Sequence, residues 1–312
     1  MKKRIIFFII GMIFVDSLYG YNSTVTSKAK GMGEALIGSV GDVNSLDFNP
    51  AGLGNILHKE IYLSYYKFYL GINNFSLYYT GLKFVAPIKF FNFYNKLGAG
   101  LSYSMFSADN LYFFHNLKGG IGIKLWKFLL GCNIKFLMKQ YRFDNFSFNM
   151  GEYNTDDLLT LKSYSKTGIS IDVGCQILVE ESNSYFKNFS FGLVIYNLLP
   201  LDLGRKYEDK APLLIGLGIG YLELKKDFTI NSDIIYDLNN NIFADYRIGI
   251  EKKINKFFTL RSGLNTTSIS IGLGYSRNVF TNFKMYFDYA FIYKYLVQES
   301  YGDHSMTIGV KF

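Results

Sequence analysis

The sequence predicts an all-β protein, a 14-stranded antiparallel transmembrane β-barrel with an N-terminal hatch segment in its lumen. The first indication is the C-terminal stretch Ser305 to Phe312, in which every second residue is apolar and the last is aromatic. The second is that the same alternation recurs upstream in stretches of about 10 residues, the length a tilted strand needs to cross a bilayer. The third is an aromatic content of 18%, with 26 Tyr and 30 Phe, because aromatic side chains gather where a barrel wall meets the membrane surfaces.

The chain divides into three regions, with boundaries near residues 20 and 58. Residues 1–20 are interpreted as a signal peptide, because three basic residues precede an apolar run, Ile5 to Val15, that is too short to span a membrane as a helix. Residues 21–58 show no strand alternation and are assigned to a hatch or plug. Residues 59–312 are assigned to the barrel, since only helices and closed barrels satisfy their backbone in lipid.

Fourteen stretches after the signal have strand character, and an even number is typical of single-chain bacterial barrels. This count predicts an outer-membrane location with both chain termini on the periplasmic side. Loops after odd-numbered stretches then face outward, and several of them are the longer ones, as expected. The asymmetry is partial, because the inner turns 87–95 and 179–187 are also long. The stretches lie near 60–69, 74–86, 96–106, 116–126, 128–140, 166–178, 188–198, 211–223, 226–237, 243–252, 256–265, 267–277, 281–292 and 303–312.

Glycine alternates with apolar residues in several of these stretches. Residues 211–221 place leucine and isoleucine on one face and Gly216, Gly218 and Gly220 on the other. The apolar set is expected to face lipid, so the glycines face inward. A wall lined with glycine lets another segment approach closely, and we therefore expect residues 21–58 inside the barrel. Tight curvature of the strands is the alternative explanation.

The segment before the first strand carries a recognisable motif. It contains Ala29-Lys30-Gly31-Met32-Gly33-Glu34-Ala35, then Asp42-Val43-Asn44-Ser45, then Asn49-Pro50-Ala51-Gly52-Leu53. In this order and place the motif resembles the outer-membrane family of FadL-type fatty-acid transporters and the related PorV/PorQ proteins. The resemblance implies a hatch in which Asn49, Pro50 and Ala51 form a compact turn, consistent with the restricted backbone of an Asn-Pro pair.

Three functions remain open at this stage. Transport of hydrophobic or amphipathic molecules predicts an apolar cavity beneath the outer loops and an inward kink in one strand. A PorV/PorQ-like binding or shuttle role in protein secretion predicts instead a surface groove on the loops near 141–165 and 199–210. A structural barrel without transport is the third. The expected partners are outer-membrane lipid and a hydrophobic small molecule or a secreted protein, with the barrel itself monomeric.

The candidate binding residues combine the motif with inward-facing arginines. Arginine suits a carboxylate because its guanidinium forms a two-pronged contact, although an ion-pair network that holds the hatch is the simpler interpretation of these charges. Cys132 and Cys175 are expected on the lipid face of neighbouring strands, where a disulfide would require matching register. The candidates are Gly31, Met32, Gly33, Asn49, Pro50, Ala51, Arg247 and Arg261.

Several other chemistries lack support. His58, His115 and His304 show no metal-ligand spacing, and no catalytic motif accompanies them. The net charge of +8 is spread along the chain rather than gathered in a basic run, so nucleic acid is not an expected partner. We therefore expect no metal, no cofactor and no enzymatic activity.

Overall fold

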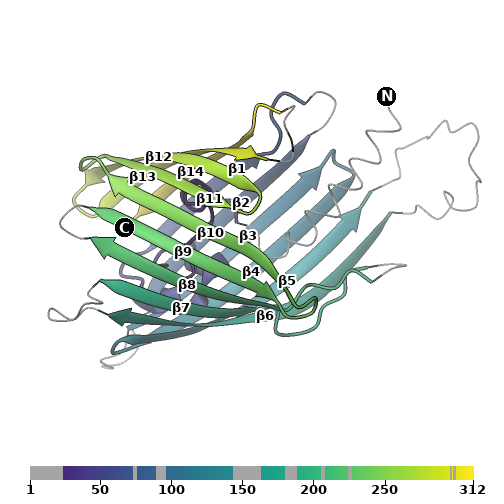
Figure 1. Ribbon diagram of the computed structural model, residues 1–312, viewed down its shortest axis with the longest axis horizontal. Coiled ribbons are helices and arrows are strands. Elements are labelled where there is room, and N and C mark those ends of the chain that lie inside the picture. Colours follow the sequence, from purple (N-terminus) through teal and green to yellow (C-terminus); the bar gives the residue numbers. More distant parts are fainter. Residues whose placement is uncertain are drawn as a thin grey trace, which may run out of the picture.

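The computed structural model describes residues 24–72, 76–88, 96–142, 163–179, 188–204, 208–223, 227–295, 297 and 300–312. Its strands close into a single barrel, in which each strand pairs antiparallel with its sequence neighbours (Figure 1). The first and last strands close the ring, with Glu60 opposite Lys311. The strands are β1 (Glu60–Lys67), β2 (Leu77–Ile88), β3 (Lys96–Ala108), β4 (Tyr112–Leu125), β5 (Phe128–Tyr141), β6 (Tyr164–Val179), β7 (Phe189–Tyr196), β8 (Leu214–Glu223), β9 (Phe228–Asp237), β10 (Ile242–Lys253), β11 (Phe258–Asn265), β12 (Ser268–Phe280), β13 (Phe283–Lys294) and β14 (Asp303–Lys311).

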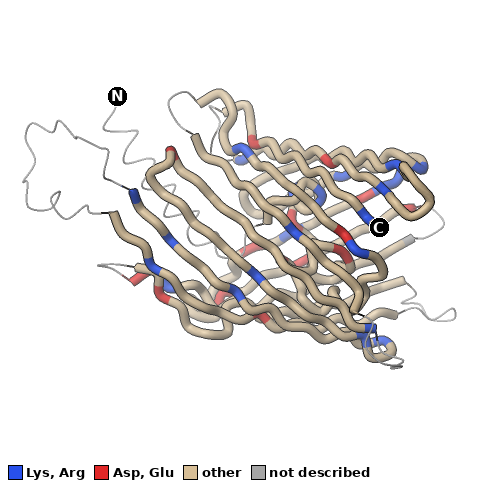
Figure 2. Tube along the Cα trace, turned by 180° about the vertical axis from the view of Figure 1, so that it is seen from behind, with Lys and Arg blue, Asp and Glu red and all other residues tan. Residues whose placement is uncertain are grey.

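The predicted strands and their number are confirmed, and the wall has two kinds of surface. Outward side chains are apolar and exposed, for example Leu63 at 60% and Ile271 at 62%, as expected for a surface in contact with lipid. Inward positions alternate with them along each strand. Figure 2 shows acidic and basic residues distributed along the strands of this wall.

The first two strands carry several apolar or aromatic residues on their inward faces, and the structure explains why. Tyr62 and Tyr66 of β1 and Leu77 and Tyr79 of β2 point inward and are at most 9% exposed. They pack on other lumen side chains rather than on water. A filled lumen therefore removes the polar face that an open channel would need.

Residues 24–56 are mostly buried within the barrel, and together with the exposed Leu57 and His58 they are called the lumen segment here. This segment contains α2 (Ser27–Gly31), α3 (Ser45–Phe48) and the 3₁₀ helix η1 (Pro50–Asn55). No helix of the described residues is long and apolar enough to span a membrane. The segment runs close against the inner wall: a Cβ added to Gly192 would lie 2.1 Å from the carbonyl oxygen of Ile37, and one added to Gly263 would lie 2.0 Å from the nitrogen of Gly33. The inward glycines thus make room for its backbone.

Candidate ligand-binding lumen

An aromatic cluster fills the lumen toward the end of the barrel opposite Phe312, which we call the outer end. It is supplied by inward positions of β1 to β4 and by the residue that follows β1. The rings contact one another edge to face, with centroids 4.4 Å apart for Tyr66 and Phe68 and 5.7 Å apart for Phe68 and Phe106. Each of its rings is at most 7% exposed. The outer aromatic cluster consists of Tyr66, Phe68, Tyr79, Phe106, Tyr112 and Phe114.

Three lysines, Lys30, Lys139 and Lys294, place their ammonium groups over rings of this cluster. The Lys30 nitrogen lies 4.7 Å from the centroid of Tyr66, and the Lys294 nitrogen lies 4.8 Å from that of Phe68. Such contacts combine an apolar surface with a positive charge, which suits an amphipathic molecule with an acidic head. Lys30 and Lys294 also have carboxylate partners, Glu34 and Asp303 respectively.

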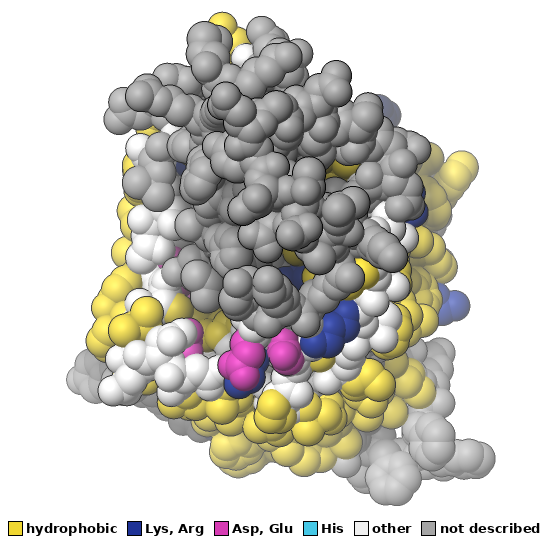
Figure 3. All heavy atoms as spheres, turned by 90° about the vertical axis from the view of Figure 1, so that its right-hand side faces the viewer, with side chains coloured by type: hydrophobic (Ala, Val, Ile, Leu, Met, Phe, Trp, Pro, Cys, Tyr) yellow, Lys and Arg dark blue, Asp and Glu magenta, His cyan; other side chains and the backbone are white. Residues whose placement is uncertain are grey.

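Residues 197–204 and 208–213 cover the cluster from above, and we call them the cap loop. Leu201 and Leu203 are buried among the cluster side chains. The loop is a small hairpin, because Ala211 donates a backbone hydrogen bond of 2.8 Å to Leu201. Lys139 of β5 pairs with Asp209 and so fixes the loop to the wall. Figure 3 looks onto this end, where charged side chains gather inside the rim and hydrophobic ones lie on the flanks.

Asn49 lies in the lumen segment below the cluster, and both the oxygen and the nitrogen of its side-chain amide are hydrogen-bonded. Its Oδ1 accepts the backbone N–H of Ala51 at 3.1 Å, which caps η1 at Pro50. Its Nδ2 donates to the carbonyl of Ile37 at 3.1 Å and to that of Cys175 in β6 at 3.0 Å. The side chain is fully buried. The Asn-Pro turn therefore joins two parts of the lumen segment to the wall.

Replacing Asn49 by alanine is expected to destabilise the barrel by about 1–3 kcal/mol, because buried backbone carbonyls lose their donor. Asn49→Asp is the stricter variant, since it keeps the cap on Ala51 but cannot donate to Ile37 or Cys175. Urea unfolding in detergent micelles measures both. Equal stability of all three proteins would contradict this role.

The Gly31-Met32-Gly33 stretch lies against β10 to β12. A Cβ at Gly31 would approach the Cα of Gly272 to 3.1 Å, and Gly33 has φ +59°, a conformation that L side chains rarely adopt. Met32 is 1% exposed, and its carbonyl faces Gly249. These residues are thus placed in wall contact, whereas the outer aromatic cluster lies elsewhere.

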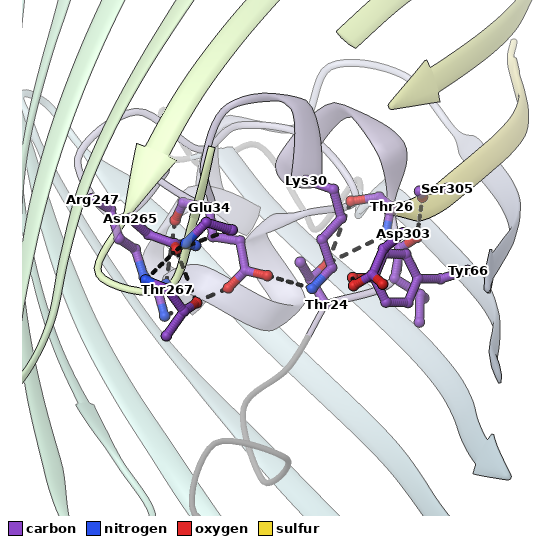
Figure 4. Close-up of polar contacts among 12 residues, drawn as sticks. Thr24, Thr26, Lys30, Glu34, Tyr66, Arg247, Asn265, Thr267, Asp303 and Ser305 are labelled. Carbon is purple, nitrogen blue, oxygen red and sulfur yellow. Dashed lines mark hydrogen bonds and ion pairs between the residues drawn. The ribbon is translucent and has the colours of Figure 1, made fainter. Parts of the chain in front are cut away.

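The two candidate arginines are already engaged by carboxylates of the chain. Arg247 lies 2.6 Å from Asp245 and 3.6 Å from Glu34 of the lumen segment, and it also donates to the carbonyl of Glu34 (Figure 4). Arg261 lies 2.6 Å from an oxygen of Glu251 and 2.6 Å from one of Asp288. The ion-pair interpretation describes these contacts, and neither guanidinium faces the outer aromatic cluster.

Some functional contacts were not anticipated from the sequence. Asp47 of α3 accepts from Lys118 at 2.8 Å and also from Lys83, deep in the barrel. Asp233 accepts the backbone N–H groups of Leu36 and Ile37 at 2.6 and 2.8 Å. The inward positions of Lys118 and Asp233 were readable from strand alternation, but their partners were not, because nothing local fixes a contact between distant segments.

The remaining sequence expectations have plain outcomes. Cys132 and Cys175 are free, and Cys132 lies opposite Val173, so the two cysteines are offset by two residues. No group of three or more potential metal ligands occurs within the described residues. Of the aromatic-rich loop near 141–165, residues 143–162 lie outside the described part, whereas Tyr141 packs against the outer aromatic cluster.

Transport predicted an inward kink in one strand, and the described wall shows three irregularities of strand pairing. The register shifts near Ala244 in β10 and near Val279 in β12. The third is between β6 and β7, where β6 has 16 residues and β7 only 8, and pairing stops at Val173. The closed ring of paired strands otherwise continues around the barrel.

Comparison with known proteins identifies the fold. No protein-family model matches the chain, and no curated protein matches it in sequence. The solved structure of the CymD monoaromatic hydrocarbon channel is similar with a TM-score of 0.60 and 11% identity, over 92% of this chain and 96% of that one. The Ralstonia pickettii toluene transporter TbuX gives 0.56 and 12%, over 94% and 99%. A Pseudomonas aeruginosa FadL homologue gives 0.59 and 11%, over 93% and 98%. The chain therefore shares the closed 14-stranded fold of FadL-type channels.

Proposed function

We propose that this protein is an outer-membrane barrel that binds hydrophobic or amphipathic small molecules in its outer lumen and passes them inward. The outer aromatic cluster carries the proposal. Transmembrane barrels commonly have polar interiors, and buried rings inside one provide a surface for apolar ligands. The fold shared with solved hydrocarbon channels supports the same function.

The cap loop and the lumen segment are proposed as the two gates of this path. Leu201 and Leu203 cover the cluster, so the cap loop must shift before a ligand reaches the rings. Below, the lumen segment lies between the cluster and the end of the barrel at Phe312, and we assign it the role of a hatch. An acidic head group would contact Lys30 and Lys294 by displacing their present partners, Glu34 and Asp303.

The test is binding of the fluorescent aromatic probe N-phenyl-1-naphthylamine to the purified protein in detergent. Phe106→Asn, which puts an amide among the rings, is expected to weaken binding roughly tenfold. The matched control is Phe136→Asn, because Phe136 faces outward and is 43% exposed. We expect its affinity for the probe to equal that of the parent protein. Equal affinity of both variants and the parent would overturn the proposal.

A PorV/PorQ-like shuttle for secreted proteins is the second candidate. The observation in its favour is a pocket formed by the cap loop, lined by residues such as Leu198, Pro200 and Leu213. This role requires a protein partner at the outer end, whereas the first requires a small molecule in the lumen. Mass spectrometry of the protein purified gently from native membranes separates them, because it detects co-purified small molecules and proteins alike.

A further inference from the structure

Among the described residues, no strand pairs with the outer half of β6 on its β7 side. Backbone groups of a strand point alternately to its two sides. Leu178 donates to Lys127 on the β5 side, whereas Ile171 accepts from Leu198 on the β7 side at 2.8 Å. The odd-numbered residues therefore point toward β7, which ends at Tyr196. Within the described chain, the backbone groups of Ser165, Thr167 and Ile169 have no hydrogen-bond partner on that side.

This edge stands at the outer limit of the apolar surface. The outward side chains of β6 are apolar from Ile177 to Ile169, where Ile169 is 54% exposed, and then change to Thr167 and Ser165. The 16 residues of β6 also exceed the roughly 10 that a tilted strand needs to cross a bilayer. The free backbone groups are thus placed where water, and a partner arriving through water, can reach them.

The cap loop supports the edge from the lumen side without covering it. Leu201 fills the space beside Gly168, where an added Cβ would meet its Cδ1 at 1.9 Å. The hydroxyl of Ser170 donates to the carbonyl of Leu199 at 3.2 Å, and Lys166 donates to that of Gly204 at 2.5 Å. The strand is therefore held extended while its edge faces sideways.

A pocket lined by apolar and polar residues opens beyond the end of β7, and two of its lining residues contact β6. Its lining includes Leu198 and Leu201, which contact β6, together with Pro200, Ala211 and Leu213. A chain that continued the sheet next to β6 would pass this pocket and could place one side chain in it. Such a pairing of backbone edge and side-chain pocket is how extended peptides are recognised by strand addition.

We propose that residues 165–169 of β6 bind an extended segment of another polypeptide by strand addition, with one apolar side chain of that segment in the cap-loop pocket. The free N–H and C=O groups of β6 repeat at every second residue, and only an extended polypeptide presents its own backbone groups with the same spacing. A second copy of this protein does not fit as an antiparallel partner, because two barrels inserted the same way have β6 strands running in the same direction. The β6 edge lies outside the outer aromatic cluster, although Leu201 of the pocket wall also packs against that cluster.

The test uses short random peptides displayed as a library and selected on the purified barrel. Selected peptides are expected to lose binding roughly tenfold or more with Thr167→Pro, which removes one free N–H. Proline is tolerated on a strand edge when its missing N–H faces away from the ladder, so the barrel still folds. Thr167→Val is the control that keeps the N–H and should bind normally.

Two further readouts make the result decisive. A single N-methyl group on a selected peptide should abolish binding when it is placed at every second residue and not at the residues between. The reason is that only alternate N–H groups of the peptide face β6. In the protein without peptide, the amides of Ser165, Thr167 and Ile169 should exchange with solvent faster than those of Lys166 and Gly168, which face β5. Three results would each overturn the proposal: peptide binding that Thr167→Pro does not weaken, N-methyl groups that act at consecutive peptide residues, or equal hydrogen-exchange rates in the two sets of amides. Failure of the fluorescent probe to bind would not affect it.

Discussion

Replacement of Asp47 by alanine is expected to destabilise the folded barrel by about 3–5 kcal/mol, because it leaves two buried lysines without their counter-charge. The Lys83 and Lys118 side chains are 3% and 2% exposed, and both ammonium groups contact the same carboxylate. Urea unfolding in micelles measures the loss. Limited proteolysis of the lumen segment should show that α3 is released at the same time.

The matched control is Asp42→Ala, which removes a more exposed ion pair with Lys28. That pair has side chains 31% and 22% exposed, so we expect a loss below about 1 kcal/mol. Asp47→Ala combined with Lys83→Met and Lys118→Met should recover most of the stability, since apolar groups of similar size replace the buried charges. Equal losses for Asp42→Ala and Asp47→Ala would contradict the assignment.

The Asp47 contact also predicts a pH dependence. Burial acts to raise the pKa of Asp47, but Lys118 and Lys83 outweigh it and hold the pKa below its usual range. A carboxylate with a lowered folded-state pKa stabilises the fold above its unfolded pKa, which is about 3.9, and loses this contribution as the pH falls further. The stability difference between the parent and Asp47→Asn should thus be full at neutral pH and shrink in strong acid.

Substitution of Gly263 by alanine is the second change with a large expected effect. The new Cβ would lie 2.0 Å from the nitrogen of Gly33 and 2.2 Å from the carbonyl carbon of Met32. Both are backbone atoms, so the lumen segment must move away from the wall, at a cost of about 1–3 kcal/mol or more. Increased cleavage of residues 24–58 by protease in the folded barrel would report this displacement.

Gly119 provides the control for Gly263. It also lies in a strand, β4, but no atom of the lumen segment lies near its Cβ position. A Cβ at Gly119 would first meet Leu101 Cδ2 at 3.4 Å, which is ordinary contact, so Gly119→Ala should leave stability nearly unchanged. If Gly263→Ala matched Gly119→Ala in both unfolding and proteolysis, the close contact between Gly33 and β11 would be refuted.

The barrel itself was readable from the sequence, because strand alternation repeats fourteen times and each repeat is a local signal. The inward glycines of 211–221 also pointed correctly to a close neighbour inside the wall. By contrast, α2 and α3 have 5 and 4 residues, and so short a helix leaves no periodic pattern.

The candidate site was predicted less well than the fold. The motif residues Asn49 and Gly33 contact the wall, but the proposed apolar binding surface comes from β1 to β4 and from Leu201 and Leu203 of the cap loop. Alternation shows that Tyr79 or Phe106 points inward, yet it does not reveal which strands bring rings together. The unequal lengths of β6 and β7 likewise follow from where the cap loop folds, which depends on contacts distant in sequence.

Photolabelling of the protein with a diazirine-bearing aromatic probe, mapped by mass spectrometry of its peptides, tests the central claim most directly. The account predicts labelling of Phe68, Phe106 and Tyr112 that is abolished by excess unmodified probe, since these rings form a saturable site inside the barrel. Outward residues such as Leu63 and Phe136 should be labelled without saturation. Labelling confined to outward residues, or unchanged by competitor at the three rings, would contradict a ligand site in the outer lumen.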